Sequence, residues 1–184
     1  MENITTTSAY ELVDKIKKGE ISSVEVCEAY LERIKKFDKD VKAWAFFDKK
    51  LLLEKAREKD DYRKSGKPLG ALHGLPIAVK DIIGTLDMPT ECGTVFRKKM
   101  SSSQDSEIVN LLKNAGAIIM GKTVTCELAY IHPSKTTNPH DYSRTPGGSS
   151  SGSAAVVASH MAHLSIGSQT GGSVIRPASY CGVV

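Results

Sequence analysis

Residues 145–182 read TPGGSSSGSAAVVASHMAHLSIGSQTGGSVIRPASYCG. The stretch contains two glycine-serine turns, GGS at residues 147–149 and again at residues 171–173, and the two serines lie 24 positions apart. Between the turns, residues 150–160 are small and alanine-rich, which predicts a tightly packed buried helix. Residues 164–167 predict a strand that leads into the second turn.

Upstream of these turns, short apolar runs alternate with helical patterns. The expected elements are, in order, a buried strand over residues 75–80, a helix over 106–115, a buried strand over 117–120, a helix over 123–130 and a polar loop over 131–148. We expect Asp105 to cap the first of these helices and Gly116 to end it. Long loops in a compact domain are often functional, which makes the polar loop of interest.

The first part of the chain, residues 8–65, is expected to be mainly helical. Two pairs have the spacing of a capping box: Ser8 with Glu11, and Ser22 with Glu25. Gly19 is expected to end the first helix, and the second is expected to have an apolar face that contains Val24, Ala29, Tyr30 and Ile34. A short strand over residues 41–47 and a charged outer helix over 49–63 complete this part.

Helices that alternate with short buried strands predict an α/β fold with a mixed, mainly parallel sheet flanked by helices. We expect residues 1–65 to be a helical segment that packs on the core, and residues 66–184 to be the first part of the α/β core. The last residues, CGVV at 181–184, have the pattern of a buried strand. The sequence is therefore expected to be a fragment of a longer protein, with the fold incomplete at the C-terminus.

The composition is that of a globular protein and excludes several functions. The chain has 184 residues and a net charge of +4, from 25 basic and 21 acidic residues, which is too mild to indicate direct nucleic-acid binding. No apolar run has the length of a membrane span, and the N-terminus lacks a signal-peptide pattern. Four cysteines are widely spaced and favour reduced thiols in a cytoplasmic protein over a zinc site: Cys27, Cys92, Cys126 and Cys181. Cys181 is expected to be a buried strand residue and not a nucleophile.

One motif is interpreted as a chance match. Residues 116–123, GAIIMGKT, fit the phosphate-loop pattern GxxxxGK[ST]. A phosphate loop follows a strand and directs its amides at the phosphate, whereas here the spacer residues form the apolar strand itself. Nucleotide binding at this motif therefore ranks last among the possible functions.

Lys80 is the candidate base of a serine hydrolase. It follows the apolar run 75–79 in GLPIAVKD, and desolvation by apolar neighbours lowers the pKa of a lysine so that its neutral form can accept a proton. In a strand, Asp81 points to the opposite face and need not pair with Lys80. A lysine that merely reaches solvent from a strand end would show the same local sequence.

The second glycine turn, QTGGS at residues 169–173, suits an oxyanion hole. Successive glycines leave backbone N–H groups uncovered, so that these can converge on a developing negative charge. The first turn, residues 147–152, could bind an anion at the start of the next helix or be an ordinary tight turn. Serine–lysine pairs are a known alternative to serine–histidine pairs, so these elements could form a hydrolase that needs neither histidine nor metal.

Taken together, these motifs resemble the signature of the amidase signature family of serine hydrolases. The matching features are the GGSS of residues 147–150, the alanine-rich helix, the TGGS of residues 170–173, Arg176-Pro177 and the CGVV end. The lysine strand, GKT followed by ELA, and Asn138-Pro139 with Ser143-Arg144 also match, so the resemblance covers nearly the whole chain.

The resemblance implies a Ser-cisSer-Lys triad. Ser173 would be the nucleophile, Lys80 the ultimate base, and Ser149, preceded by a cis peptide bond, the serine that shuttles the proton. The oxyanion and the substrate would be held around Thr170, Gly171, Gly172 and Ser173, with Ser150 beside them. Arg176, Gln169 and Ser150 would support the site structurally.

The chain departs from the family pattern at several positions. Ser151 lies where family members commonly have glycine, and Gln169 where they commonly have aspartate. His160 and His163 lie where a glycine and a proline are common. None of these positions belongs to the implied triad, and we interpret the histidines as helix-end or surface residues. Family members are much longer than this chain, so most of the substrate pocket is expected beyond Val184.

The resemblance implies a cytoplasmic amidase that cleaves a small-molecule carboxamide through an acyl-enzyme, without metal or organic cofactor. No membrane or direct nucleic-acid partner is implied, and a homo-oligomer is possible. Two alternatives stay open. One is the A subunit of a glutamyl-tRNA amidotransferase, which the absence of an aspartate at Gln169 weighs mildly against, and the other is a catalytically inactive truncated fragment.

Overall fold

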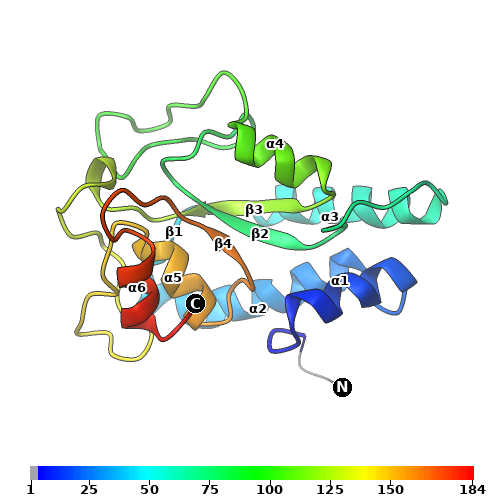
Figure 1. Cartoon of the computed structure of the whole chain (residues 1–184), viewed down its shortest axis with the longest axis horizontal. Helices are drawn as coiled ribbons and strands as arrows, with labels where there is room; N and C mark the ends of the chain where they lie inside the picture. Colours follow the sequence, from blue (N-terminus) through cyan, green and yellow to red (C-terminus); the bar gives the residue numbers. More distant parts are fainter. Residues whose placement is uncertain (1–3) are drawn as a thin grey trace.

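The computed structural model describes residues 4–184 of the chain (Figure 1). Within these residues a four-stranded sheet has the order β1-β3-β2-β4. Strand β2 (Pro76–Lys80) lies in its middle and pairs in parallel with β3 (Ile118–Thr123) and with β4 (Ser165–Ile166). Strand β1 (Trp44–Phe46) pairs antiparallel with β3. The expected fold class, a mixed and mainly parallel sheet with helices around it, is confirmed.

Helices lie on both sides of this sheet. In Figure 1, α4 (Glu107–Asn114) lies above the strands, and α1 (Ala9–Lys18) and α2 (Ser23–Val41) lie below them. The carboxyl ends of the strands face the short helices α5 (Ser151–Ala158) and α6 (Ile175–Cys181). Helix α5 contacts β2, β3 and β4, so the turn that precedes it is placed beside the ends of the parallel strands.

The N-terminal helices follow their local signals. Both predicted capping boxes are formed, and Gly19 ends α1 in the left-handed conformation at φ 76°. The predicted α2 face packs on the core through Val24, Tyr30 and Ile34, and Val26 and Cys27 are buried beside them. Ala29 is only partly covered. Helix α3 (Lys49–Lys64) carries many charges, yet one apolar stripe of it is buried against the core. This stripe consists of Leu52, Leu53 and Ala56.

Three local predictions were wrong. The segment predicted as a helix over residues 123–130 contains only a short 3-10 turn, Glu127–Ala129, because Leu128 and Ala129 have positive φ angles of 49° and 56°. Asp105 does not cap α4, whose N-cap is Ser106. The Asp105 carboxylate instead accepts the Leu86 N–H at 2.7 Å and pairs with Lys113 at 2.6 Å.

The third wrong prediction concerns residues 181–184, which form no strand: Cys181 is the last residue of a helix, and the residues after it have no regular structure. Residues Ile175–Cys181 form α6, and Gly182 ends this helix in the left-handed conformation at φ 67°. Pro177 is tolerated because it lies in the first turn, where its nitrogen needs no helical acceptor. Cys181 is buried as expected, but in a helix.

The strand predicted over residues 41–47 is shorter, since Val41 still belongs to α2. Because β1 lies between α2 and α3 and pairs with β3, residues before 65 contribute to the sheet as well as to its cover. The division of the chain at residue 65 stays a prediction. No helix among residues 4–184 is long and apolar enough to cross a membrane.

Candidate active site

The site is built around Lys80, the last residue of β2. Its side chain has no exposed surface, and its neighbour in the sheet register is Thr123 of β3. Because successive side chains of a strand point to opposite faces, Lys80 points toward α5 while Asp81 points away from it. Asp81 pairs with Lys122 at 3.2 Å, so it does not neutralise Lys80, as the sequence predicts.

The Lys80 amine is held by two serines. Its Nζ lies 2.8 Å from Ser149 Oγ and 2.9 Å from Ser168 Oγ, and it also donates to the Ser168 carbonyl at 3.3 Å. None of the ion pairs within residues 4–184 includes Lys80. Burial lowers the pKa of Lys80 to about 8, and the nearby Cys126 thiol opposes this shift. Lys80 is therefore a lysine that can be neutral near physiological pH.

Ser149 is fixed from both sides of its backbone. The Gly148–Ser149 peptide bond is cis, as the resemblance implies. The Ser149 carbonyl accepts the Cys126 N–H at 3.0 Å, and the Gly148 carbonyl accepts two hydrogen bonds from Arg176, at 3.1 Å and 2.8 Å. A Cβ on Gly148 would lie 2.5 Å from Cys126 Sγ, which explains why a glycine precedes this serine.

The second glycine turn lies next to the first. The Ser173 carbonyl accepts the Ser150 N–H at 3.0 Å, and the Gln169 side-chain oxygen accepts the Val174 and Ile175 N–H groups at 2.9 Å and 3.0 Å. Within the described part of the chain, the Ser173 hydroxyl forms no hydrogen bond. Its side chain is partly exposed. The structure thus brings the turns together through their backbones, without a direct Ser149–Ser173 hydroxyl contact.

The amide groups of this second turn are uncovered. In the region that the structure describes, the N–H groups of residues 170–173 donate no hydrogen bond within the chain. A Cβ at Gly171 would meet nothing within 4 Å, so the turn faces open space. Uncovered amides beside a serine hydroxyl are what an oxyanion hole requires.

Ser168 is the residue that the sequence analysis missed. Strand β4 pairs with β2 at Val79–Ile166, which places Ser168 just beyond the strand end and beside Lys80. The Ser168 carbonyl also accepts a hydrogen bond from Ser150 Oγ at 3.2 Å, which gives Ser150 a supporting contact. Only the pairing of β4 with β2 could have identified Ser168, because its local sequence is that of an ordinary polar turn.

The spacer residues before the GKT motif lie in a strand, as the sequence analysis expects, and this strand continues through the motif itself. Gly121, Lys122 and Thr123 all belong to β3, and all three are buried. Lys122 has no exposed surface and donates to Thr90 Oγ1 at 2.8 Å and to the Pro89 carbonyl at 3.0 Å. Its amine is thus occupied by protein acceptors and does not face a phosphate site.

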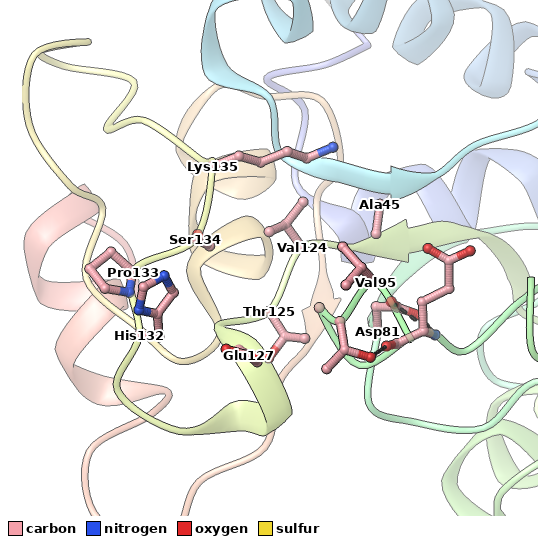
Figure 2. Close-up of a pocket in the computed structure, with 13 residues that line it drawn as sticks. Ala45, Asp81, Val95, Val124, Thr125, Glu127, His132, Pro133, Ser134 and Lys135 are labelled. Atoms are coloured by element: carbon pink, nitrogen blue, oxygen red, sulfur yellow. Dashed lines mark hydrogen bonds between the residues drawn. The ribbon is translucent and has the colours of Figure 1, made fainter. Parts of the chain in front are cut away.

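A hollow of about 440 Å³ lies on the Asp81 side of the sheet. Figure 2 shows the loop with His132 and Pro133 facing Asp81 and Val95 across it, with Thr125 between them. Lys80, Ser149 and Ser173 are not among its lining residues.

The chain belongs to the amidase family, since the family model described as Amidase matches residues 25–184. Over its full length it is 42% identical to the A subunit of the glutamyl-tRNA(Gln) amidotransferase of Salinispora tropica and 41% identical to that of Leptospira interrogans. In each case it spans 39% of the relative's length.

Solved structures agree with this assignment. The native peptide amidase of Stenotrophomonas maltophilia superposes with a TM-score of 0.88 at 34% identity, over 94% of this chain and 38% of that one. A fatty acid amide hydrolase superposes with a TM-score of 0.90 at 32% identity, over 97% of this chain and 32% of that one. The resemblance found in the sequence is thus confirmed at the level of family and fold.

Proposed function

We propose that this chain carries the catalytic part of an amidase that hydrolyses a carboxamide through an acyl-enzyme on Ser173. The observation that carries the proposal is the contact between the buried amine of Lys80 and Ser149 Oγ at 2.8 Å, in a site with no carboxylate paired to that lysine. A serine hydroxyl is a weak nucleophile until a base takes its proton, and a neutral lysine can be that base.

The Lys80–Ser149 contact supplies the second half of the proton path, and the first half requires the Ser173 hydroxyl to turn toward Ser149. With a pKa of about 8, roughly one Lys80 amine in ten is neutral at pH 7. Ser173 Oγ attacks the amide carbon and passes its proton to Ser149, while the Ser149 proton moves to Lys80. When the C–N bond breaks, Ser149 gives its proton to the departing amine or ammonia and takes one back from protonated Lys80. Water then cleaves the ester between the acyl group and Ser173, which restores the hydroxyl.

The oxyanion of each tetrahedral intermediate would bind the uncovered amides of the second turn, formed by Thr170, Gly171, Gly172 and Ser173. Loss of one such donor typically costs about 3 kcal/mol of transition-state stabilisation. Gln169 and Arg176 keep this geometry through their backbone contacts, so their proposed role is support. These steps use groups of this chain alone and need no metal or organic cofactor.

A fluorophosphonate probe tests the proposal. It phosphonylates activated serines, so intact-mass spectrometry should show one adduct on the folded chain and none on Ser173→Ala. Ser179→Ala is the matched control, since Ser179 is an exposed serine on the nearby helix α6. An adduct that persists in Ser173→Ala would contradict the proposal. A folded chain that forms no adduct would also contradict it.

A second candidate is the A subunit of a glutamyl-tRNA amidotransferase, favoured by the relatives of that kind at 42% and 41% identity. The aspartate missing at Gln169 does not exclude it, because the turn needs only an acceptor oxygen and Gln169 supplies one. Glutamine hydrolysis that requires partner subunits would support this candidate, and hydrolysis of simple amides without them would favour the free-standing amidase. A cytoplasmic location is part of either proposal, supported by four free, buried cysteines.

A further inference from the structure

The polar loop that precedes the first glycine turn is bonded to the C-terminal end of helix α6. The Asn138 side-chain amide donates to the Tyr180 carbonyl at 2.9 Å, and Nε2 of His140 lies 2.8 Å from the Cys181 carbonyl. Because a carbonyl oxygen can only accept, the His140 ring is the donor in the second contact. Both carbonyls belong to the last two residues of α6, where a helix offers its carbonyls no partner of its own.

The two preceding carbonyls of α6 are satisfied by the backbone that follows the helix. The Ala178 carbonyl accepts the Val183 N–H at 2.9 Å, and the Ser179 carbonyl accepts the Gly182 N–H at 3.3 Å. The helix end is therefore completed by two side chains that lie 42 and 41 positions earlier in the chain.

The loop that carries these donors is itself braced. Asn138 is 7% exposed, its side-chain oxygen accepts the His140 N–H at 3.0 Å, and its backbone N–H donates to the Arg144 carbonyl at 2.9 Å. The Arg144 side chain pairs with Asp141 at 3.0 Å. Residues 138–144 contain two motifs to which the sequence analysis gave no role, and these contacts make them a fixed support for α6.

The other end of α6 meets the turn that contains the shuttle serine. Arg176 lies in the first turn of the helix and donates twice to the Gly148 carbonyl, at 3.1 Å and 2.8 Å. Along the helix, a Cβ on Gly147 would lie 3.2 Å from Pro177 Cα, so the backbones are already in close contact. Because α6 has only 7 residues, about two turns separate the anchored end from Arg176.

From this arrangement we propose that Asn138 and His140 are positioning residues, which anchor α6 and so hold Arg176 against the turn of the shuttle serine. The inference rests on the proposed function, which makes Ser149 the shuttle and Ser173 the nucleophile. Within residues 4–184, neither positioning residue forms a hydrogen bond with these serines, so the effect passes through α6.

Asn138→Ala and His140→Ala each remove one donor from the helix end. We expect fluorophosphonate labelling of Ser173 to slow about fivefold in each variant, which is the equilibrium change that one net hydrogen bond typically carries. His140→Gln keeps an amide donor near the position of Nε2 and should recover most of the wild-type rate. Because His140 is exposed while Asn138 is buried, His140→Ala tests the proposal even if Asn138→Ala does not fold.

The NMR signal of the Arg176 Nε–H reports the placement of α6 without any serine chemistry. Its hydrogen bond to the Gly148 carbonyl slows exchange with solvent, and Arg176→Lys assigns the signal. Loss of the anchor should speed this exchange about fivefold. Arg33 is the internal control in the same spectrum, because its Nε–H donates to the Ser159 carbonyl at the end of α5 and should stay unchanged.

Ser22→Ala is the matched control for stability. It removes the side-chain cap of α2, an interaction of similar strength that makes no contact with α6. The Ser22→Ala chain should therefore keep the wild-type labelling rate and the wild-type exchange of Arg176, although its free energy of unfolding falls.

The outcomes separate this inference from the proposed function. Faster exchange at Arg176 alone, slower labelling, and recovery of both in His140→Gln support the anchor. Faster exchange in a protein whose wild type is never labelled would show that the serine chemistry is wrong while the anchoring of α6 stands. The inference is overturned if Arg176 exchanges freely in the wild type, if the folded variants keep wild-type exchange or labelling, or if Ser22→Ala slows labelling equally.

Discussion

Replacing Gly148 by alanine should distort the site through a single methyl group. The new Cβ would lie 2.5 Å from Cys126 Sγ, closer than such atoms approach in proteins. Cys126 cannot retreat, since it is 5% exposed and its N–H is bonded to the Ser149 carbonyl. Gly148 is also fixed, because its carbonyl accepts two hydrogen bonds from Arg176.

The strain has an expected size. Overpacking of this kind typically costs about 1–3 kcal/mol of stability. Ser149 must also move, and a displacement near 1 Å can reduce a rate by roughly a hundredfold. We therefore expect Gly148→Ala to fold with a lower free energy of unfolding and to react with the fluorophosphonate at least tenfold more slowly, measured by denaturant titration and by labelling kinetics.

Two variants control this prediction. Gly171→Ala adds a methyl group to the other turn, where nothing lies within 4 Å, and should leave stability nearly unchanged. Combining Gly148→Ala with Cys126→Ala removes the clashing sulfur and should recover most of the labelling rate. A Gly148→Ala chain with wild-type stability and reactivity would refute the reasoning, and an unrescued double variant would refute its steric cause.

Four further predictions concern the same site. Labelling should rise with pH around a midpoint of about 8, because neutral Lys80 is the reactive form, and Lys80→Met should abolish the dependence. The unfolded chain keeps the higher lysine pKa of 10.5 and binds more protons between pH 8 and 10.5, so this group makes stability rise with pH across that window, which denaturant titrations can follow. Ser168→Ala removes one hydroxyl partner of Lys80 but leaves the carbonyl, so labelling should slow by roughly three- to tenfold; an unchanged rate would make that hydroxyl dispensable. Arg176→Lys removes the pair of hydrogen bonds to the Gly148 carbonyl, so we expect slower labelling, while circular dichroism should show an intact fold. Wild-type labelling kinetics would contradict this.

Much of the secondary structure could be predicted because its signals are local. The capping boxes at Ser8 and Ser22 join residues three apart, and Gly19 ends α1 through its own conformational freedom. The buried strands follow from uninterrupted apolar runs. Each of these signals involves only residues a few positions apart, so the local sequence is enough to reveal it.

Two of the failed predictions share a physical cause. Residues 126–130 have helical residue types, yet the Cys126 N–H bonds to Ser149 and the Leu128 N–H to Cys92, and these distant partners impose a non-helical path. Likewise, Asp105 has the residue type and position of a cap but is taken by Lys113 and Leu86. In each case a tertiary partner outcompetes the local one.

The sequence by itself determined the family, the lysine strand and the two serine turns, because residue types at fixed spacings carry them. Tertiary structure alone decided which groups meet the Lys80 amine, since those contacts join residues 69 and 88 positions apart. It also decided which lysine has a carboxylate partner: the fold places Asp81 beside Lys122 and leaves Lys80 with hydroxyl and carbonyl partners. No local pattern encodes that choice, because it depends on which strands are neighbours and which face each side chain takes.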